Sequence, residues 1–394
     1  MSEWVSKKIG DIANLYQGLA INAKTKHLLV TESSLPLLRI KDLLEGTKEQ
    51  FVDPKLAPLQ CVVEPNELVM TRTGQVGYVF MGKSGVLHNN CFKITVTDPE
   101  VDTRFLYWHF NSNAQRDYLT TIAAGSVQPD LNHKVFKDYD VLLPPLTEQK
   151  AIASVLSSLD DKIDLLHRQN QTLEAMAETL FRQWFIEEAK EDWEEVKLGD
   201  LCEVITKGTT PKQFLESGVN FIKAESLTDT GSFIRSKFAS VSTEIHDTFL
   251  KRSILQAGDL LFSIAGTIGR VAKVTADILP ANTNQALAIL RPKSHVNSDL
   301  IYCILKSSYF QELADGKVVH AVQPNLSLGE ISNSCIRLPN QKVLQVFTEQ
   351  VSAYFAKKSV NSSQIQTLEN LRDTLLPKLM SGEVRVQYQT EEVA

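Results

Sequence analysis

Two short segments of this 394-residue sequence carry residues that could act on phosphate groups or on a metal ion. Residues 77–84 fit the pattern G-x4-G-K-S, in which the backbone N–H groups of a glycine-rich loop hold phosphate in front of a helix. Pro129-Asp130, followed by Glu148 and Lys150, resembles the paired acids and lysine of a metal-dependent nuclease. Each pattern is short enough to occur by chance, so its surroundings decide.

The surroundings of both segments argue against that chemistry. The interior of the first, Tyr78–Met81, reads as a strand rather than as a flexible loop, and no helix start follows it. In the second, Thr147 can cap a helix and Glu148 suits the positive end of its dipole. We therefore expect neither a nucleotide site nor a nuclease site.

Other enzyme motifs are absent from the sequence. A DNA methyltransferase needs an Asn/Asp-Pro-Pro-aromatic tetrapeptide, but the only Pro-Pro pair, Pro144-Pro145, lies between leucines. There is no G-x-S-x-G, no H-E-x-x-H and no C-x-x-C, and the five cysteines are dispersed, which favours free thiols over disulfides or zinc. No secretory signal and no run of about 18 apolar residues is present. We expect a cytoplasmic protein that is not an enzyme and binds no metal.

The net charge of −6 is not typical of a nucleic-acid binder, but the charge is unevenly distributed. Residues 147–192 hold 10 acidic and 5 basic side chains, whereas residues 1–146 hold 16 and 15, and residues 193–339 hold 15 of each. The two large segments are therefore nearly neutral, and each could carry a basic face.

The chain is an internal repeat. Trp4-x5-Gly10-Asp11 recurs as Trp193-x5-Gly199-Asp200, at an offset of 189. Further matches keep the same order with small drift: Gly74-x-x-Gly77 with Gly266-x-x-Gly269, Asn89-Asn90 with Asn284-Gln285, Tyr107 with Tyr302, Val127-Gln128-Pro129 with Val322-Gln323-Pro324, and Leu143-Pro144 with Leu338-Pro339. Repeats of this length indicate a duplicated structural unit.

Each half begins with a strand-rich block of about 145 residues and continues into a long helix. The clearest strand candidates are Leu68–Thr71, Tyr78–Met81, Phe92–Thr95, Asp259–Ile264 and Ala286–Leu290. One helical stretch is expected in each block, at Thr103–Leu119 and Ser298–Ala314, before prolines precede the long helix. The fold class is therefore α+β, with a pseudo-two-fold internal repeat.

The two long helices show an apolar position every three or four residues over nearly five heptads, which is typical of a coiled coil. The predicted seam comprises Ile152, Leu159, Ile163, Leu166, Asn170, Leu173, Leu180, Tyr354, Asn361, Ile365, Leu368 and Leu375. One asparagine lies near the middle of each seam, so we predict antiparallel helices with Asn170 near Asn361. The alternative is two ordinary amphipathic helices on separate cores.

Four motifs of this chain occur together: the duplicated Trp-x5-Gly-Asp start, the Gly-x-x-Gly hairpin, the Gln-Pro segment, and the helix start Leu143-Pro-Pro-Leu-Thr-Glu-Gln149. Together they resemble type I restriction-modification specificity subunits. The helix ends Thr179–Phe185 and Leu375–Glu383 also fit. The second helix starts less typically, as Leu338-Pro-Asn-Gln-Lys342. The resemblance covers essentially the whole chain.

The resemblance implies a division into target-recognition domains at 1–146 and 188–340, spacer helices at 147–187 and 341–384, and a tail at 385–394. Each recognition domain would read one half of a gapped, asymmetric site in double-stranded DNA. The helices would set the gap and bind two adenine methyltransferase subunits, which motor-nuclease subunits join. S-adenosylmethionine, ATP and magnesium would belong to those partners, and this chain would bind no cofactor.

Base edges are read mainly by Arg, Asn and Gln, and phosphates are held by Lys, Arg, Ser and Thr. The candidate DNA-binding residues are polar residues of the repeat-matched loops: Arg72, Thr73, Gln75, His88, Asn89, Asn90, Ser126 and Gln128 in the first block, and Lys207, Thr209, Thr210, Lys212, Ser263, Thr267, Arg270, Asn284, Gln285 and Gln323 in the second. For any one of these, a role in a turn or on the solvated surface is the competing interpretation.

Arg72 is matched by Ile264, so the two blocks should read different sequences. Two other interpretations remain open at this point. The chain could be a protein scaffold that does not bind DNA, which the near-neutral charge allows, or it could serve a stand-alone modification system that lacks restriction subunits.

Overall fold

The computed structural model describes residues 4–123, 129–317 and 325–386. The chain divides into two compact units. The first unit comprises Met1–Asp164 with Gln366–Ala394, and the second unit comprises Leu165–Ile365. Each unit therefore contains a stretch of both long helices, α6 (Leu146–Arg182) and α12 (Gln341–Met380).

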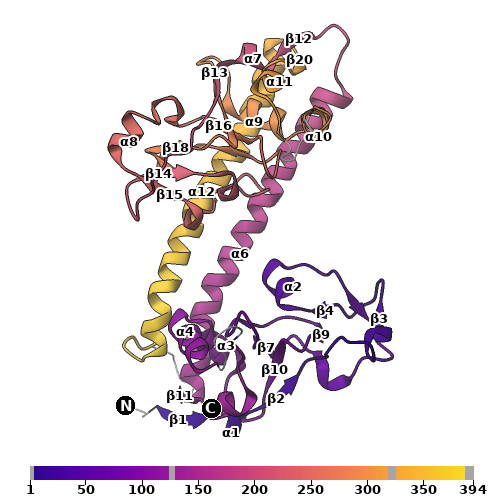
Figure 1. Ribbon diagram of the computed structural model, residues 1–394, viewed down its shortest axis with the longest axis vertical. Coiled ribbons are helices and arrows are strands. Elements are labelled where there is room, and N and C mark those ends of the chain that lie inside the picture. Colours follow the sequence, from indigo (N-terminus) through magenta and orange to yellow (C-terminus); the bar gives the residue numbers. More distant parts are fainter. Residues whose placement is uncertain (1–3, 124–128, 318–324, 387–394) are drawn as a thin grey trace, which may run out of the picture. The chain divides into compact units, whose positions relative to one another are not determined.

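The first unit is built around a four-stranded antiparallel sheet in the order β2-β10-β7-β8 (Figure 1). Its strands are β1 (Val5–Lys8), β2 (Ala13–Gln17), β3 (Leu29–Val30), β4 (Leu37–Leu38), β5 (Phe51–Val52), β6 (Val62–Val63), β7 (Leu68–Thr71), β8 (Val79–Phe80), β9 (Gly85–Leu87), β10 (Cys91–Val96) and β11 (Asp140–Leu143). Its short helices are α1 (Ile9–Ile12), α2 (Ile40–Glu45), α3 (Thr103–Asn111), α4 (Asn113–Ile122) and α5 (His133–Lys137). The other strands form the sheets β1-β11, β3-β5 and β4-β9-β6.

The second unit repeats this plan with a four-stranded sheet in the order β13-β19-β16-β17. Its strands are β12 (Glu194–Lys197), β13 (Cys202–Lys207), β14 (Val219–Ile222), β15 (Ala239–Val241), β16 (Leu260–Ser263), β17 (Val271–Lys273), β18 (Ala281–Thr283), β19 (Leu287–Pro292) and β20 (Cys335–Leu338). Its short helices are α7 (Leu198–Leu201), α8 (Thr243–Asp247), α9 (Ser298–Lys306), α10 (Ser308–Asp315) and α11 (Leu328–Ser332). The β12-β20 pair corresponds to β1-β11, which confirms the predicted internal repeat.

The central strands β7 and β16 each begin with three consecutive apolar residues, because both faces of each sheet are covered. On β7, Leu68 and Met70 pack into the core that contains Phe105 and Trp108, whereas Val69 packs into a second core with Leu38 and Leu43. Successive side chains of a strand point to opposite faces, so an uninterrupted apolar run predicts a strand buried on both sides. All five predicted strands are present, with ends shifted by no more than two residues.

The helical stretch predicted in each block is two helices rather than one. Ser112 is extended (ψ 143°), and its side chain accepts a hydrogen bond from the Gln115 backbone N–H at the start of α4. Ser307 does the same for Phe310 at the start of α10. A serine at this position satisfies an otherwise unpaired helix N–H, and so it ends one helix and begins the next. The predicted helical stretches are therefore present, each divided into two helices.

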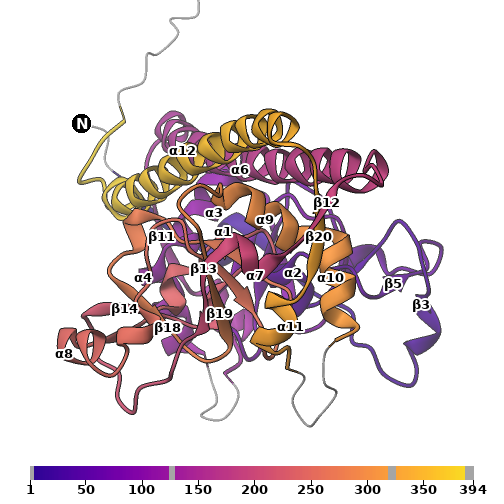
Figure 2. The same cartoon turned by 90° about the horizontal axis from the view of Figure 1, so that it is seen from above.

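The long helices run antiparallel within each unit. In the second unit, Asn361 Nδ2 donates to Asn170 Oδ1 at 2.9 Å, and further along, Phe181 meets Phe347 with ring centroids 6.0 Å apart. In the first unit, Arg372 Nη1 lies 2.7 Å from Asp160 Oδ1. The two helices lie side by side in the second unit (Figures 1 and 2). The predicted asparagine pair and its direction are confirmed.

The predicted seam residues are all buried or half-buried. They do not form one uniform seam, because the ends join the cores of the units. Ile152 belongs to the main core of the first unit, and Leu180 and Tyr354 pack against that of the second. Beyond Arg182 the helix widens into a π-helical turn, Gln183–Glu187. Among the residues that the structure describes, no helix combines the length and apolar character needed to cross a membrane.

Candidate nucleic-acid interface

One end of the four-stranded sheet collects most of the first unit's candidate residues. Because β10 is antiparallel to both β2 and β7, the last residues of β2 and β7 lie beside the start of β10: Gln17 faces Phe92 and Thr71 faces Cys91. We call these strand ends, together with the loops that connect them, the loop end of the sheet. Just beyond it, the Arg72 backbone N–H donates to the Asn90 carbonyl at 2.9 Å. The loops at 72–77 and 88–90 are therefore neighbours.

Arg72 lies at the centre of a polar group that we call the Arg72 cluster, formed by Gln17, Arg72, Thr73 and Asp130. Arg72 Nε donates to Asp130 Oδ1 at 2.9 Å, and Nη2 donates to Oδ2 at 2.5 Å. Nη1 donates to Gln17 Oε1, and Thr73 Oγ1 donates to Asp130 Oδ1 at 2.8 Å. The hydrogen bond from Arg72 lowers the pKa of Asp130, so the carboxylate stays ionised at neutral pH.

The remaining candidates at this loop end differ in accessibility. Gln75 is exposed, and His88, Asn89 and Asn90 are half-buried. The Asn89 N–H donates to the Leu19 carbonyl at 3.0 Å, and its carbonyl accepts from Gln17 Nε2. Burial lowers the pKa of His88, which keeps its ring neutral at physiological pH. The backbone of this loop is thus fixed by the protein itself.

The second unit has the same loop end, formed by β13, β16 and β19. Lys207 faces Ala288, as Gln17 faces Phe92 in the first unit. Thr210 Oγ1 donates to Gln285 Oε1 at 2.5 Å, and both residues are exposed. The nearby candidates Lys212 and Thr267 are also exposed, and Lys207, Thr209 and Asn284 are half-buried. These residues are accessible to a ligand that approaches the loop end.

Ser263 does not fit its predicted role. Its side chain is fully buried, its hydroxyl donates to the Thr267 carbonyl at 2.6 Å, and it accepts from the Arg270 N–H at 2.7 Å. Both bonds close the β16–β17 hairpin, in which Gly266 and Gly269 have φ of 76° and 96°, values that favour glycine. Ser263 shapes this turn and cannot reach DNA.

The hydrogen bonds correct the register of the repeat at the loop end. The Leu131 N–H donates to the Arg72 carbonyl, as the Leu326 N–H does to Ile264, which confirms the match of Arg72 with Ile264. The Cys91 N–H donates to His88 and the Leu287 N–H to Asn284, so His88 corresponds to Asn284. The predicted match of Asn89-Asn90 with Asn284-Gln285 is therefore wrong by one residue.

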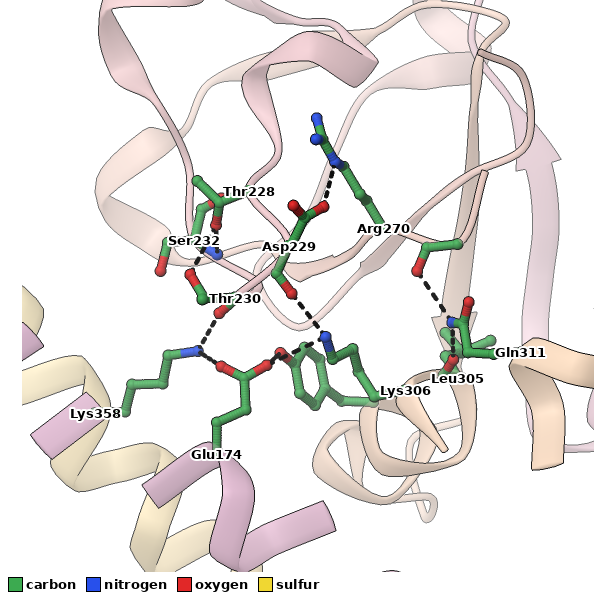
Figure 3. Close-up of polar contacts among 12 residues, drawn as sticks. Glu174, Thr228, Asp229, Thr230, Ser232, Arg270, Leu305, Lys306, Gln311 and Lys358 are labelled. Carbon is green, nitrogen blue, oxygen red and sulfur yellow. Dashed lines mark hydrogen bonds and ion pairs between the residues drawn. The ribbon is translucent and has the colours of Figure 1, made fainter. Parts of the chain in front are cut away.

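Arg270 is tied to its own unit (Figure 3). Its Nε donates to Asp229 Oδ1 at 2.7 Å, and Nη1 donates to the Leu227 carbonyl at 3.0 Å. The Asp229 carbonyl in turn accepts from Lys306 Nζ at 2.7 Å. A quarter of the Arg270 side chain remains exposed, so it is only partly available to a ligand.

The loop of Asp229 also rests on the helix pair of the second unit, through a group that the sequence did not predict (Figure 3). Glu174 on α6 accepts from Tyr302 Oη and from Lys358 Nζ, both at 2.7 Å, and Lys306 Nζ lies 3.6 Å away. Lys358 also donates to the Thr230 carbonyl at 2.7 Å. We call this the Glu174 junction. The only sequence signal for it was the repeated tyrosine pair, Tyr107 and Tyr302.

The rejected motifs have structural roles in the described residues. Residues 77–84 contain β8 and lead directly into β9, with no helix behind the loop. Asp130 pairs with Arg72, and Glu148 pairs with Arg385 at 2.5 Å. Over the ranges that the structure describes, no group of three His, Cys, Asp or Glu side chains could hold a metal ion. The candidates Ser126, Gln128 and Gln323 lie outside the described residues.

Comparison with known proteins gives consistent matches. The family model for the type I restriction modification DNA specificity domain matches residues 1–175 and 190–370. The MjaIX specificity subunit of Methanocaldococcus jannaschii is 27% identical over 420 residues, covering 98% of this chain and 94% of that protein. The EcoBI specificity subunit of Escherichia coli is 25% identical, covering 98% and 88%. The crystal structure of a type I S subunit from M. genitalium shares the fold, with a TM-score of 0.59, 18% identity, and 98% and 97% coverage.

Proposed function

This chain belongs to the type I restriction-modification DNA specificity family, and on that basis we propose that each unit reads one half of a split, gapped DNA target. The observation that carries the proposal is the repeated loop end. The two units place different side chains on one backbone framework, which suits the reading of two different half-targets. Arg72 and Gln17 stand where Ile264 and Lys207 stand in the second unit.

The proposal assigns the chemistry to other subunits. In it, the helix pair sets the gap between the half-targets and binds two adenine methyltransferase subunits, which motor-nuclease subunits join. Those partners would hold S-adenosylmethionine, ATP and magnesium, and this chain would contribute recognition without catalysis. The complex would act in the cytoplasm, where its DNA target lies.

A methylation map tests the proposal. The chain is expressed with its adenine methyltransferase subunit in a host that lacks adenine methylation, and the genome is sequenced with detection of modified bases. We expect one gapped, asymmetric motif with methyladenine in each half. If both subunits are soluble and associated but no motif appears, a scaffold role replaces the proposed one.

Paired variants test whether the units read independently. Arg72→Ala should relax or abolish recognition in one half of the motif, and Lys207→Ala should affect the other half. Both side chains lie at the loop end of their own unit, although Lys207 corresponds to Gln17 and not to Arg72. Equal changes in both halves from either variant would contradict independent reading.

A further inference from the structure

The Arg72 guanidinium is held on one side and open on the other. Arginine carries five N–H donors in a planar fork. Asp130 accepts from Nε and Nη2, and Gln17 accepts from Nη1. No hydrogen bond to the remaining N–H on each of Nη1 and Nη2 is present in the part of the chain that the structure describes, and 23% of the side chain is exposed. Arg72 therefore presents two donors from a fixed plane.

The orientation of this plane is determined by the backbone as well as by side chains. Thr73 and Asp130 form a β-bridge, and the Leu131 N–H donates to the Arg72 carbonyl at 2.8 Å. The segment that carries Asp130 is thus fixed against the segment that carries Arg72. A side chain that is ordered before binding loses less conformational entropy when it binds, so a held arginine is suited to selective recognition.

We propose that Arg72 reads a guanine in the half-target bound by the first unit, and that Asp130 and Gln17 are the positioning residues that orient it. This inference rests on the proposed function. The major-groove edge of guanine offers two acceptors, N7 and O6, which match two N–H donors. Adenine offers one acceptor and one donor there, so it leaves one arginine N–H unpaired.

At the matching described positions of the second unit, this arrangement is absent. Ile264 takes the place of Arg72 and is 1% exposed, and Asn325 takes the place of Asp130. The guanine assignment therefore applies to one half-target only. A guanidinium fork also matches a phosphate group, but removing an arginine that contacts phosphate would weaken binding to all sequences alike and reduce its salt dependence.

The test uses the assembled complex of this chain with its methyltransferase and duplexes that carry the mapped target. In the half-target that Arg72→Ala affects, each guanine is replaced in turn by 7-deazaguanine, which lacks the N7 acceptor. At one position, binding by the wild-type complex should weaken about fivefold or more. The same replacement should weaken binding by the Arg72→Ala complex no further, since the contact is already lost.

Positioning is tested by Asp130→Asn, which keeps the side-chain shape and removes the charge. We expect it to reduce discrimination at the same guanine while leaving recognition of the second half unchanged. Arg72→Lys should not restore discrimination, because an ammonium lacks the planar fork. Lys7→Ala, which removes the 2.6 Å Lys7–Asp98 ion pair of the same unit, is the matched control and should leave discrimination intact.

Each other outcome overturns a defined part of the inference. A gapped motif without guanine in that half, or a 7-deazaguanine effect that persists in Arg72→Ala, overturns the guanine assignment alone. If Arg72→Ala lowers the affinity for all DNA uniformly, Arg72 contacts a phosphate and not a guanine. If Asp130→Asn leaves discrimination at that guanine unchanged, Asp130 does not position Arg72. A wild-type complex with no preferred sequence overturns the proposed function, and the guanine assignment with it.

Discussion

The loop ends of the two units share a backbone framework and differ in the side chains placed on it. The carbonyls of Arg72 and Ile264 accept equivalent hydrogen bonds, from Leu131 and Leu326 at 2.8 and 3.0 Å. Arg72 nevertheless enters a polar cluster that reaches the surface, whereas Ile264 is buried. Backbone pairing and core burial preserve the framework, so the surface positions beside it can diverge without loss of the fold.

The units also differ in how deeply the ion pairs between their long helices are buried. In the second unit, the side chains of Glu174 and Lys358 are each only 12% exposed. The ion pair between the same two helices in the first unit, Arg372 with Asp160, is 25% and 41% exposed. A buried charge that loses its partner is costly, whereas an exposed pair contributes little. The junction in the second unit should therefore be the more sensitive one.

The largest expected effect follows from this difference. Glu174→Ala leaves Lys358 and Lys306 without their carboxylate and should lower the stability of the second unit by about 3–5 kcal/mol. Asp160→Ala, its matched control in the first unit, should cost no more than about 1 kcal/mol. Thermal unfolding of the complex, with hydrogen exchange of peptides from each unit, measures both. Similar losses from the two variants would show that burial does not distinguish the junctions.

A second difference concerns pH. His109 in α3 is buried, and burial lowers its pKa to about 4, while its Nε2 lies 2.8 Å from Tyr139 Oη. The matching position in α9 of the second unit is Ile304, which cannot titrate. The burial of His88 and His133 in the first unit lowers their pKa values as well. The first unit alone should therefore lose stability in mild acid through these sites.

The direction follows from proton binding. The unfolded chain takes up a proton on His109 below its ordinary pKa of about 6.5, but the folded chain does so only near 4, so stability falls as pH falls between these values. The loss should approach about 3 kcal/mol at pH 4. Thermal unfolding at pH 7.5 and pH 5 should show a smaller acid shift in His109→Ile than in the wild type. Equal shifts would place the acid sensitivity elsewhere.

Much of the architecture could be predicted from the sequence because it depends on patterns of burial. The uninterrupted apolar run from Leu68 indicates a strand buried on both faces, and the heptads around Asn170 and Asn361 repeat at the period of paired helices. The Arg72 cluster could not be predicted in the same way. Asp130 and Gln17 lie 58 and 55 residues from Arg72 along the chain, and no local pattern marks such a contact.

The two predictions that were wrong at the loop end, the register of the repeat and the role of Ser263, failed for a related reason. The letters of Asn89-Asn90 and Asn284-Gln285 suggested one register, whereas the hydrogen bonds of Cys91 and Leu287 fix another. Ser263 was a candidate because it is a polar residue beside a repeat-matched loop, but its hydroxyl closes a hairpin. In both cases the deciding contact involves a backbone group, which the identity of a side chain does not report.

The smallest expected effect concerns the polar position in the helix pair of the second unit. Asn361 Nδ2 donates to Asn170 Oδ1 at 2.9 Å, and both side chains are at most 8% exposed. Asn361→Leu leaves the Asn170 amide buried without its short hydrogen bond, which should cost about 1–3 kcal/mol. Replacing both asparagines with leucine removes the unpaired group and should recover most of that loss, because apolar pairs suit a coiled-coil seam.

A buried asparagine pair also fixes helix register, so the double variant should show faster hydrogen exchange or mixed register in this stretch despite its stability. In the first unit, Leu156 of α6 and Leu376 of α12 belong to one apolar core, and exchange there should not change. A double variant as unstable as the single one would mean that packing, not the unpaired amide, accounts for the loss.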